Sequence, residues 1–219
     1  MGVLSPKDLE YIKSKFEKEL IREVPIVLLE SDNCELCGTV KQLIGELAEV
    51  SNGKIQYTVN KLQDFHKELL GVNRGPIILI GEKVEIRYTG APLGEEGWAF
   101  LEAISLVSNR RHMFKDHEDE LSSLANKVKI ETMVTPTCPA CPHAVLLAHN
   151  VAVASKGRVI SDVVEAYEFP EIADKYNVNA VPTVVLSVNG NYNGSVFSIG
   201  VPRPEALLKA VLRLGNADI

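Results

Sequence analysis

The chain has 219 residues, 46% of them hydrophobic, so it can bury one large core or two small ones. Its 23 basic and 29 acidic side chains give a formal net charge of −6, which argues against nucleic-acid or membrane-surface binding, because both need clustered Lys and Arg. The sequence has no apolar run near the ~20 residues that span a bilayer, and its first residues lack a secretory signal. We therefore expect a cytoplasmic protein that binds neither nucleic acid nor a membrane.

A predicted helix opens the chain. Ser5 followed by Pro6 is typical of an N-cap and a first helical position. The apolar side chains that follow share one helical face: Leu9, Ile12, Phe16 and Leu20. This spacing predicts a helix that packs one side against the rest of the protein.

The elements after this helix occur twice, in the same order. In the first half, strand-like runs and helical apolar spacings are predicted at 26–29, 40–47, 77–80, the residues before Gly90, and about 95–107. The second half opens with a leading helix at about 116–126. The same elements then follow at 128–134, 144–152, 183–186, the residues before Gly200, and about 205–214. The strand–helix–strand–helix–strand–strand–helix order predicts an α/β fold, with a small mixed β-sheet flanked by helices in each half.

Cysteines and prolines recur at matching positions of the two halves. All four cysteines fall into two Cys-x-x-Cys pairs: Cys34 with Cys37, and Cys138 with Cys141. The first cysteines of the pairs lie 104 residues apart, and Pro76 and Pro182 lie 106 apart. This near-constant offset indicates two tandem copies of one domain. The charged segment 108–115 predicts the boundary, with units at 1–114 and 115–219.

The cysteine pairs favour redox chemistry. A Cys-x-x-Cys pair at a helix start places its first sulfur near unpaired backbone N–H groups, which stabilise the thiolate. The second cysteine lies about one turn further on, where it can resolve a mixed disulfide by attacking the first sulfur. We therefore expect Cys34 and Cys138 to attack substrates, and Cys37 and Cys141 to resolve the products.

Each proline is expected to face the cysteines of its own unit. Pro76 and Pro182 head strands, where a missing N–H is tolerated, and X-Pro bonds are the ones that tolerate cis geometry. A cis-proline loop would leave the backbone of Gly75 and Val181 free to pair with an extended substrate. These four residues are thus candidate substrate-binding residues, although a lone proline is usually an ordinary loop residue.

One acidic residue is a candidate for proton transfer. Glu131 lies in a predicted strand near the second cysteine pair, and burial would raise its pKa. The alternative is a solvated strand position beside Lys129.

Metal binding is the main alternative for the cysteines. Zinc ribbons place two such pairs ~15–20 residues apart, whereas Cys37 and Cys138 are 101 apart. A cluster that bridges two chains is a further possibility. We expect no metal and no bound cofactor.

Three segments carry a resemblance to a known family: 134–142 around the second pair, 176–182 before Pro182, and 87–92. With them the whole chain resembles the protein disulfide oxidoreductases of thermophilic archaea and bacteria, also called glutaredoxin-like proteins, which contain two fused thioredoxin folds. The resemblance implies that the protein reduces, forms or isomerises disulfides in protein substrates. It also implies a thioredoxin-reductase-like, NADPH-dependent flavoprotein as electron donor.

Several positions depart from this pattern. Gly75 stands where a side chain is usual, so we expect a looser groove at the first pair. The acidic residue that thioredoxins carry six positions before the first cysteine is replaced by Leu28 and Thr132, so proton transfer needs another group or water. Glu35 lies beside Cys34 and opposes thiolate formation there. We therefore expect the C-terminal centre to be the more active.

Two other functions remain open at this level. The chain would be a docking or chaperone module if only one pair were chemically active, and a metal or iron–sulfur carrier if the cysteines held a cluster. Thiol–disulfide exchange is the leading interpretation.

Overall fold

The structure is a computed structural model that describes residues 2–189 and 194–217. Its first half contains α1 (Pro6–Glu19), β1 (Val24–Glu30), α2 (Cys37–Val50), β2 (Ile55–Lys61), α3 (Asp64–Leu70), β3 (Ile77–Ile80), β4 (Ile86–Thr89) and α4 (Glu96–Asn109). The second half contains η1 (Lys115–His117), α5 (Glu118–Ser122), β5 (Val128–Val134), α6 (Cys141–Ala154), β6 (Val159–Glu165), α7 (Pro170–Lys175), β7 (Thr183–Val188), β8 (Ser195–Ile199) and α8 (Pro204–Gly215). Every element predicted from the sequence is present.

The leading helix of the second half is shorter than predicted. It was expected over about 116–126, but α5 ends at Ser122. Beyond it the backbone is held by other partners: Arg158 donates hydrogen bonds to the carbonyls of Leu124 and Ala125, and the N–H of Asn126 donates to the Gly215 carbonyl. These contacts replace the helical hydrogen bonds, while the expected inward residues Leu121 and Leu124 are still buried.

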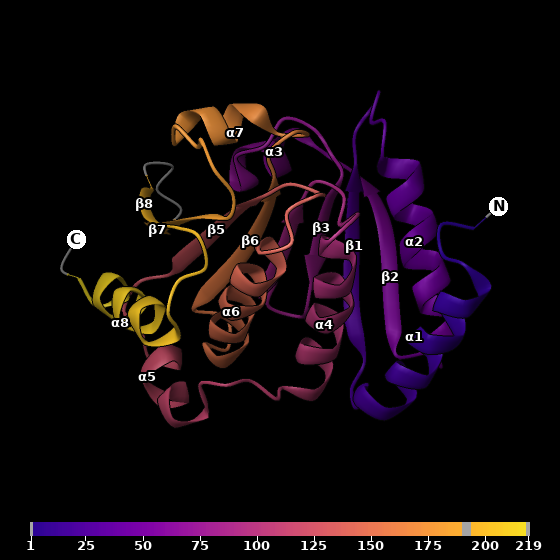
Figure 1. Ribbon diagram of the computed structural model, residues 1–219, viewed down its shortest axis with the longest axis horizontal. Helices are drawn as coiled ribbons and strands as arrows, with labels where there is room; N and C mark the ends of the chain where they lie inside the picture. Colours follow the sequence, from indigo (N-terminus) through magenta and orange to yellow (C-terminus); the bar gives the residue numbers. More distant parts are fainter. Residues whose placement is uncertain (1, 190–193, 218–219) are drawn as a thin grey trace.

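One continuous sheet runs through both halves (Figure 1), in the order β2-β1-β3-β4-β6-β5-β7-β8. Each half contributes four strands in the same relative order, which confirms the expected tandem thioredoxin-like units with mixed sheets. The sequence did not predict that the two sheets join. The join is a parallel pairing of β4 with β6, from Ile86 opposite Ser161 to Thr89 opposite Val164. The boundary at 114/115 stays a prediction.

Helices cover both faces of the sheet. Alternation along the strands sends Leu28 towards α1, α2, α4 and α6, and sends its neighbour Leu29 to the other face. Leu29 packs there in a cluster that includes Leu70 of α3 and Ile172 of α7. Each face is therefore a shared apolar layer that draws on both halves of the chain.

The two units also share a buried polar contact. The Tyr88 ring on β4 meets Phe100 of α4 edge-on at 5.2 Å, and its hydroxyl lies 3.1 Å from Nε2 of His149 on α6. His149 Nδ1 lies 2.9 Å from the Ser161 hydroxyl. Burial lowers the pKa of His149 to about 3, so the ring is neutral and packs as an uncharged core residue.

A buried ion pair crosses the join itself. The guanidinium of Arg87 on β4 donates to Asp162 on β6, and the Thr89 hydroxyl donates to the same carboxylate at 2.9 Å. Arg87 also donates to the Leu70 carbonyl at 3.0 Å. The side chains of Arg87 and Asp162 are 6% and 0% exposed, so solvent does not screen this pair.

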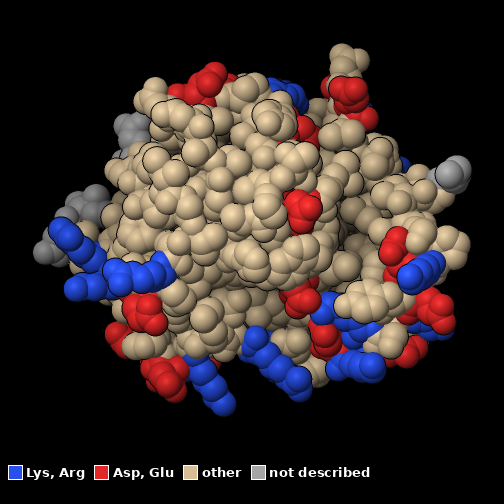
Figure 2. Space-filling model, viewed as in Figure 1, with Lys and Arg blue, Asp and Glu red and all other residues tan. Residues whose placement is uncertain are grey.

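Charge is not separated by sign on the face shown in Figure 2, where acidic and basic side chains lie interspersed along the lower margin. Among the helices of the described residues, none combines the length and apolar character needed to cross a membrane.

The pair at the join predicts a large loss of stability when one partner is removed. Changing Arg87 to Leu leaves the Asp162 carboxylate buried without its cation, which should lower the free energy of unfolding by about 3–5 kcal/mol. Chemical denaturation followed by circular dichroism measures this loss. The matched control is Lys61→Ala, which breaks the solvent-exposed Lys61–Asp32 pair and should leave the free energy of unfolding almost unchanged. Equal losses in the two variants would contradict this account of the join.

Candidate active site

Both cysteine pairs lie at the same end of the strands, beyond the carboxyl ends of β1 and β5. The strands β1, β4, β6 and β5 all run in the same direction, so the loops that follow β1 and β5 leave from one edge. Three strands separate β1 from β5, which corresponds to roughly 19 Å at the usual strand spacing. The sheet therefore presents two separate centres side by side.

Each pair forms a disulfide, with a Cα–Cα distance of 5.5 Å in both. The helices begin at the second cysteines, Cys37 and Cys141. In the first centre the Cys37 N–H donates to Cys34 Sγ at 3.1 Å, which gives one of the unpaired amides of the α2 N-terminus a sulfur partner. Cys34 is partly exposed and Cys138 is 8% exposed, whereas Cys37 and Cys141 are 5% and 0% exposed.

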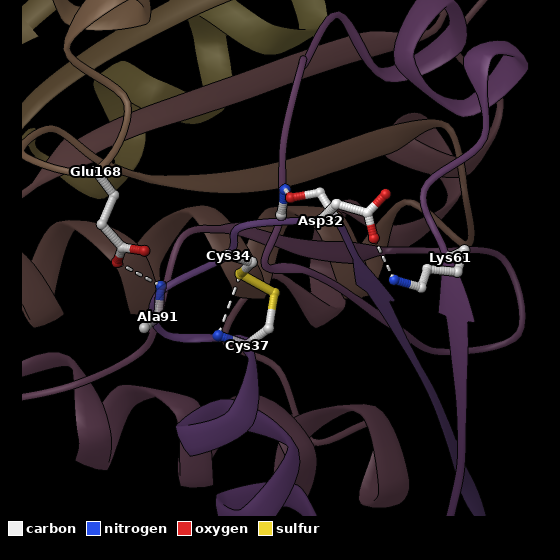
Figure 3. The surroundings of a disulfide bond; sticks show 8 residues. Asp32, Cys34, Cys37, Lys61, Ala91 and Glu168 are labelled. Atoms are coloured by element: carbon white, nitrogen blue, oxygen red, sulfur yellow. Dashed lines mark hydrogen bonds and ion pairs between the residues drawn. A yellow bond between two sulfur atoms is a disulfide. The ribbon is translucent and has the colours of Figure 1, made fainter.

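Polar contacts surround the first centre (Figure 3). The ammonium of Lys61 lies 2.6 Å from the Asp32 carboxylate, and this hydrogen bond lowers the pKa of Asp32. The Ser31 hydroxyl accepts the Gly75 N–H at 3.0 Å. These contacts fix the loops on either side of the disulfide.

The peptide bonds before Pro76 and Pro182 are cis, as predicted. Each proline carbonyl accepts an N–H from a glycine of the neighbouring loop, Gly90 at 3.0 Å and Gly200 at 2.7 Å. The substrate-binding role of Gly75, Pro76, Val181 and Pro182 stays a prediction.

The expectation of a looser groove at Gly75 is wrong. A Cβ at this position would lie 2.5 Å from the Leu29 carbonyl oxygen and 3.4 Å from Cys37 Sγ. Gly75 is present because the backbone passes too close to its neighbours for a side chain.

Glu131 lies away from the cysteines. Alternation along β5 places it on the face of α3 and α7, whereas α6 covers the other face. It is 3% exposed, so it does not occupy the solvated position considered as the alternative. Its carboxylate pairs with Lys129 at 2.8 Å and accepts the Tyr176 hydroxyl at 3.0 Å. The structure therefore does not bring Glu131 to the second disulfide, and its proton-transfer role stays a prediction.

A buried carboxyl group at the start of α4 was not predicted from the sequence. Glu96 in the first turn of α4 is 2% exposed, and neither of its oxygens has a hydrogen-bond partner within the described residues. Burial and the neighbouring charge of Glu95 raise the pKa of Glu96 to about 8. A signal was present, because Glu96 shares a helical stripe with the apolar residues Phe100 and Val107.

The start of α4 lies against the loop of the second centre. The N–H of its neighbour Glu95 donates to the carbonyl of Pro136, two residues before Cys138, at 2.9 Å. The helices α4 and α6 pack against each other, and Tyr88 contacts both Phe100 of α4 and His149 of α6. Phe100 lies one turn after Glu96, and His149 lies two turns after Cys141. Glu96 and Cys141 therefore lie at the same end of this helix pair.

Comparisons with known proteins agree with this geometry. A family model described as a thioredoxin domain matches residues 127–212. A thioredoxin of Methanocaldococcus jannaschii is 38% identical over 86 residues, which are 39% of this chain and 94% of that protein. The crystal structure of a protein disulfide oxidoreductase from Aeropyrum pernix superposes with a TM-score of 0.83 at 31% identity, and covers 100% of this chain and 98% of its own.

A longer relative matches only in part. An alkyl hydroperoxide reductase component of Staphylococcus epidermidis is 31% identical over 156 residues, or 71% of this chain. The match covers 29% of that protein, so the chain spans under a third of its length.

The position of each cysteine at its helix predicts which thiols react first. In the reduced protein at neutral pH, brief treatment with iodoacetamide should label Cys34 and Cys138, because each precedes a helix N-terminus that stabilises its thiolate. Mass mapping of the alkylated peptides gives the order of labelling. Earlier labelling of Cys37 or Cys141 would show that the roles are reversed.

The buried carboxyl of Glu96 predicts how stability depends on pH. In the unfolded chain the group ionises near pH 4.5, but in the folded protein only near pH 8, so the folded state holds an extra proton between these values and loses stability as pH rises. Glu96→Gln should remove this loss and stabilise the protein at pH 8 by about 2–4 kcal/mol, with little change at pH 5. Denaturation curves from pH 5 to 8 measure the difference. Glu10→Gln, at an exposed position of α1, is the control, and parallel curves for Glu96→Gln and the parent would contradict the assignment.

Proposed function

The chain belongs to the protein disulfide oxidoreductase family and is a thiol–disulfide oxidoreductase, and on this basis we propose that it reduces, forms or isomerises disulfides of other proteins through both of its centres. The observation that supports this most directly is the pair of Cys-x-x-Cys disulfides at helix N-termini, each beside a cis-proline loop. In reduction, the Cys138 thiolate attacks a substrate disulfide and releases one substrate thiolate. Cys141 then attacks Cys138 Sγ, which releases the second thiolate and leaves the Cys138–Cys141 disulfide.

The C-terminal centre is proposed to be the more active. Glu35 adds a negative charge beside Cys34, whereas Pro139 and Ala140 beside Cys138 are neutral. Glu96 further supports the second centre, because a carboxyl group with a pKa about 8 is matched to a thiol of ordinary pKa ~8.5. We assign to it the proton that Cys141 gives up when it attacks.

Each turnover leaves a disulfide that a two-electron donor must reduce. We propose a thioredoxin-reductase-like flavoprotein for this step. This chain is similar to part of an alkyl hydroperoxide reductase component, which supports a reductase as the redox partner of this chain. Together with this donor we propose a cytoplasmic location.

The test is insulin reduction by variants in which one cysteine is changed to serine, with dithiothreitol as donor. Cys138→Ser should lower the rate about tenfold or more, because attack needs this thiolate, and Cys34→Ser should have the smaller effect. A variant with all four cysteines changed to Ser is the control for a docking or chaperone role without chemistry. Equal losses in the single variants, or a larger loss at Cys34, would refute the proposed ranking, and unchanged activity of the fourfold variant would refute the function.

Metal analysis of protein purified without oxygen tests the remaining carrier hypothesis. Stoichiometric zinc or iron, with a visible absorption spectrum in the case of a cluster, would favour that function instead.

A further inference from the structure

The second unit covers one side of the first centre. The Arg74 guanidinium, next to Gly75, pairs with the Glu171 carboxylate at 2.9 and 3.0 Å and also donates to the Glu168 carbonyl. It stacks on the ring of Phe169 at 4.7 Å. Residues 168–171 of the second unit therefore hold the cis-proline loop of the first.

The same segment occupies a backbone donor at this centre. The Glu168 carboxylate accepts the Ala91 N–H at 2.7 Å (Figure 3). Glu168 is itself held in place, because its own N–H donates to the Glu165 carboxylate at 2.6 Å. Space is tight here as well, since a Cβ on Gly90 would lie 2.6 Å from Cβ of Glu165. The loop 90–92 is closed off by a carboxylate of the other unit.

The internal repeat provides the comparison. Ala91 corresponds to Val201, because both follow the glycine that donates to the cis-proline carbonyl. Ala91 is 5% exposed, whereas Val201 is 46% exposed. A Cβ on Gly200 would meet no atom within 4 Å. The second centre therefore has an open platform where the first has a covered one.

The residues before the two prolines differ in the same way. Gly75 is buried and its N–H is bonded to the Ser31 hydroxyl, whereas Val181 is half-buried. An extended protein substrate binds by main-chain hydrogen bonds to exposed backbone such as that before a cis-proline. Cys34, in contrast, is partly exposed. The first centre thus exposes its attacking sulfur without the platform that a peptide needs.

On the basis of the proposed function, we infer that the two centres divide substrates by size. Both centres exchange with protein disulfides, but the first favours small disulfides, which need only reach Cys34, and the second favours extended protein segments. Glu168 and Arg74 are the residues that set this specificity, because they hold the second unit over the first centre's loops.

The reaction at the first centre is a two-step thiol–disulfide exchange. The Cys34 thiolate attacks a small disulfide RS–SR, which forms the Cys34–S–S–R bond and releases RS⁻. Cys37 then attacks Cys34 Sγ, which forms the Cys34–Cys37 disulfide and releases the second RS⁻. Two electrons pass from the dithiol to the small disulfide, and the two thiol protons end on two RSH.

Variants with one intact centre test the inference. Cys138→Ser/Cys141→Ser keeps only the first centre, and Cys34→Ser/Cys37→Ser keeps only the second. Each is reduced, freed of reductant, and mixed with insulin or with bis(2-hydroxyethyl) disulfide, and oxidation of the remaining pair is followed by quenched alkylation and mass spectrometry. The ratio of the insulin rate to the small-disulfide rate should be about tenfold or more lower for the first centre, since backbone hydrogen bonds to the substrate are lost there. Equal ratios would overturn the inference.

A second pair of variants tests the residues named. In the first-centre protein, Arg74→Ala/Glu168→Ala should raise this ratio several-fold, and Asp174→Ala, which removes an exposed carboxylate of α7, should leave it unchanged. An unchanged ratio in the double variant would overturn the role of Arg74 and Glu168. If neither disulfide oxidises either single-centre protein, the proposed function itself fails, which is a different result from equal ratios.

Discussion

The parallel pairing of β4 with β6 determines how the rest of the molecule is arranged. It joins two four-stranded sheets into one continuous sheet. Because the pairing is parallel, both cysteine loops leave from one edge of the sheet, and α4 and α6 lie side by side over one face. The buried Arg87–Asp162 pair secures this join, and its charges would be costly anywhere that lacked such a partner.

The join also makes the two redox centres unequal, although they come from a repeat. The loops that face the first disulfide precede β3 and follow β4, in the interior of the sheet, where the β6–α7 segment covers them through Arg74 and Glu168. The corresponding loops of the second centre precede β7 and follow β8, the two outermost strands, where Val201 is open to solvent. The difference between two copies of one fold is therefore a consequence of position in the sheet as much as of sequence.

Local patterns predicted the fold well, because spacing and capping act over a few residues. The Ser5 N-cap, the apolar stripe of α2, the cis geometry at Pro76 and Pro182, and the cysteine pairs were all predictable in this way. The contacts between the units were not. Whether Gly75 is loose or crowded depends on the Leu29 carbonyl, a neighbour 46 positions earlier in the chain. Glu131 could not be placed because strand alternation gives two faces, and only the packing of α6 decides which one meets the cysteines. Glu96, in contrast, lies on the apolar stripe of α4, so its burial could be predicted from the spacing alone.

Gene duplication usually leaves each copy free to be lost again. Here the β4–α4 loop contacts two loops of the second unit. Its Ala91 N–H donates to the Glu168 carboxylate, and its Glu95 N–H donates to the Pro136 carbonyl. Deleting the second copy would leave β4 as a bare strand edge and Arg87 without its carboxylate, and deleting the first would free the cysteine loop of the second from its support. Neither half carries all of the contacts that stabilise it, so each copy of the repeat depends on the other for its own structure.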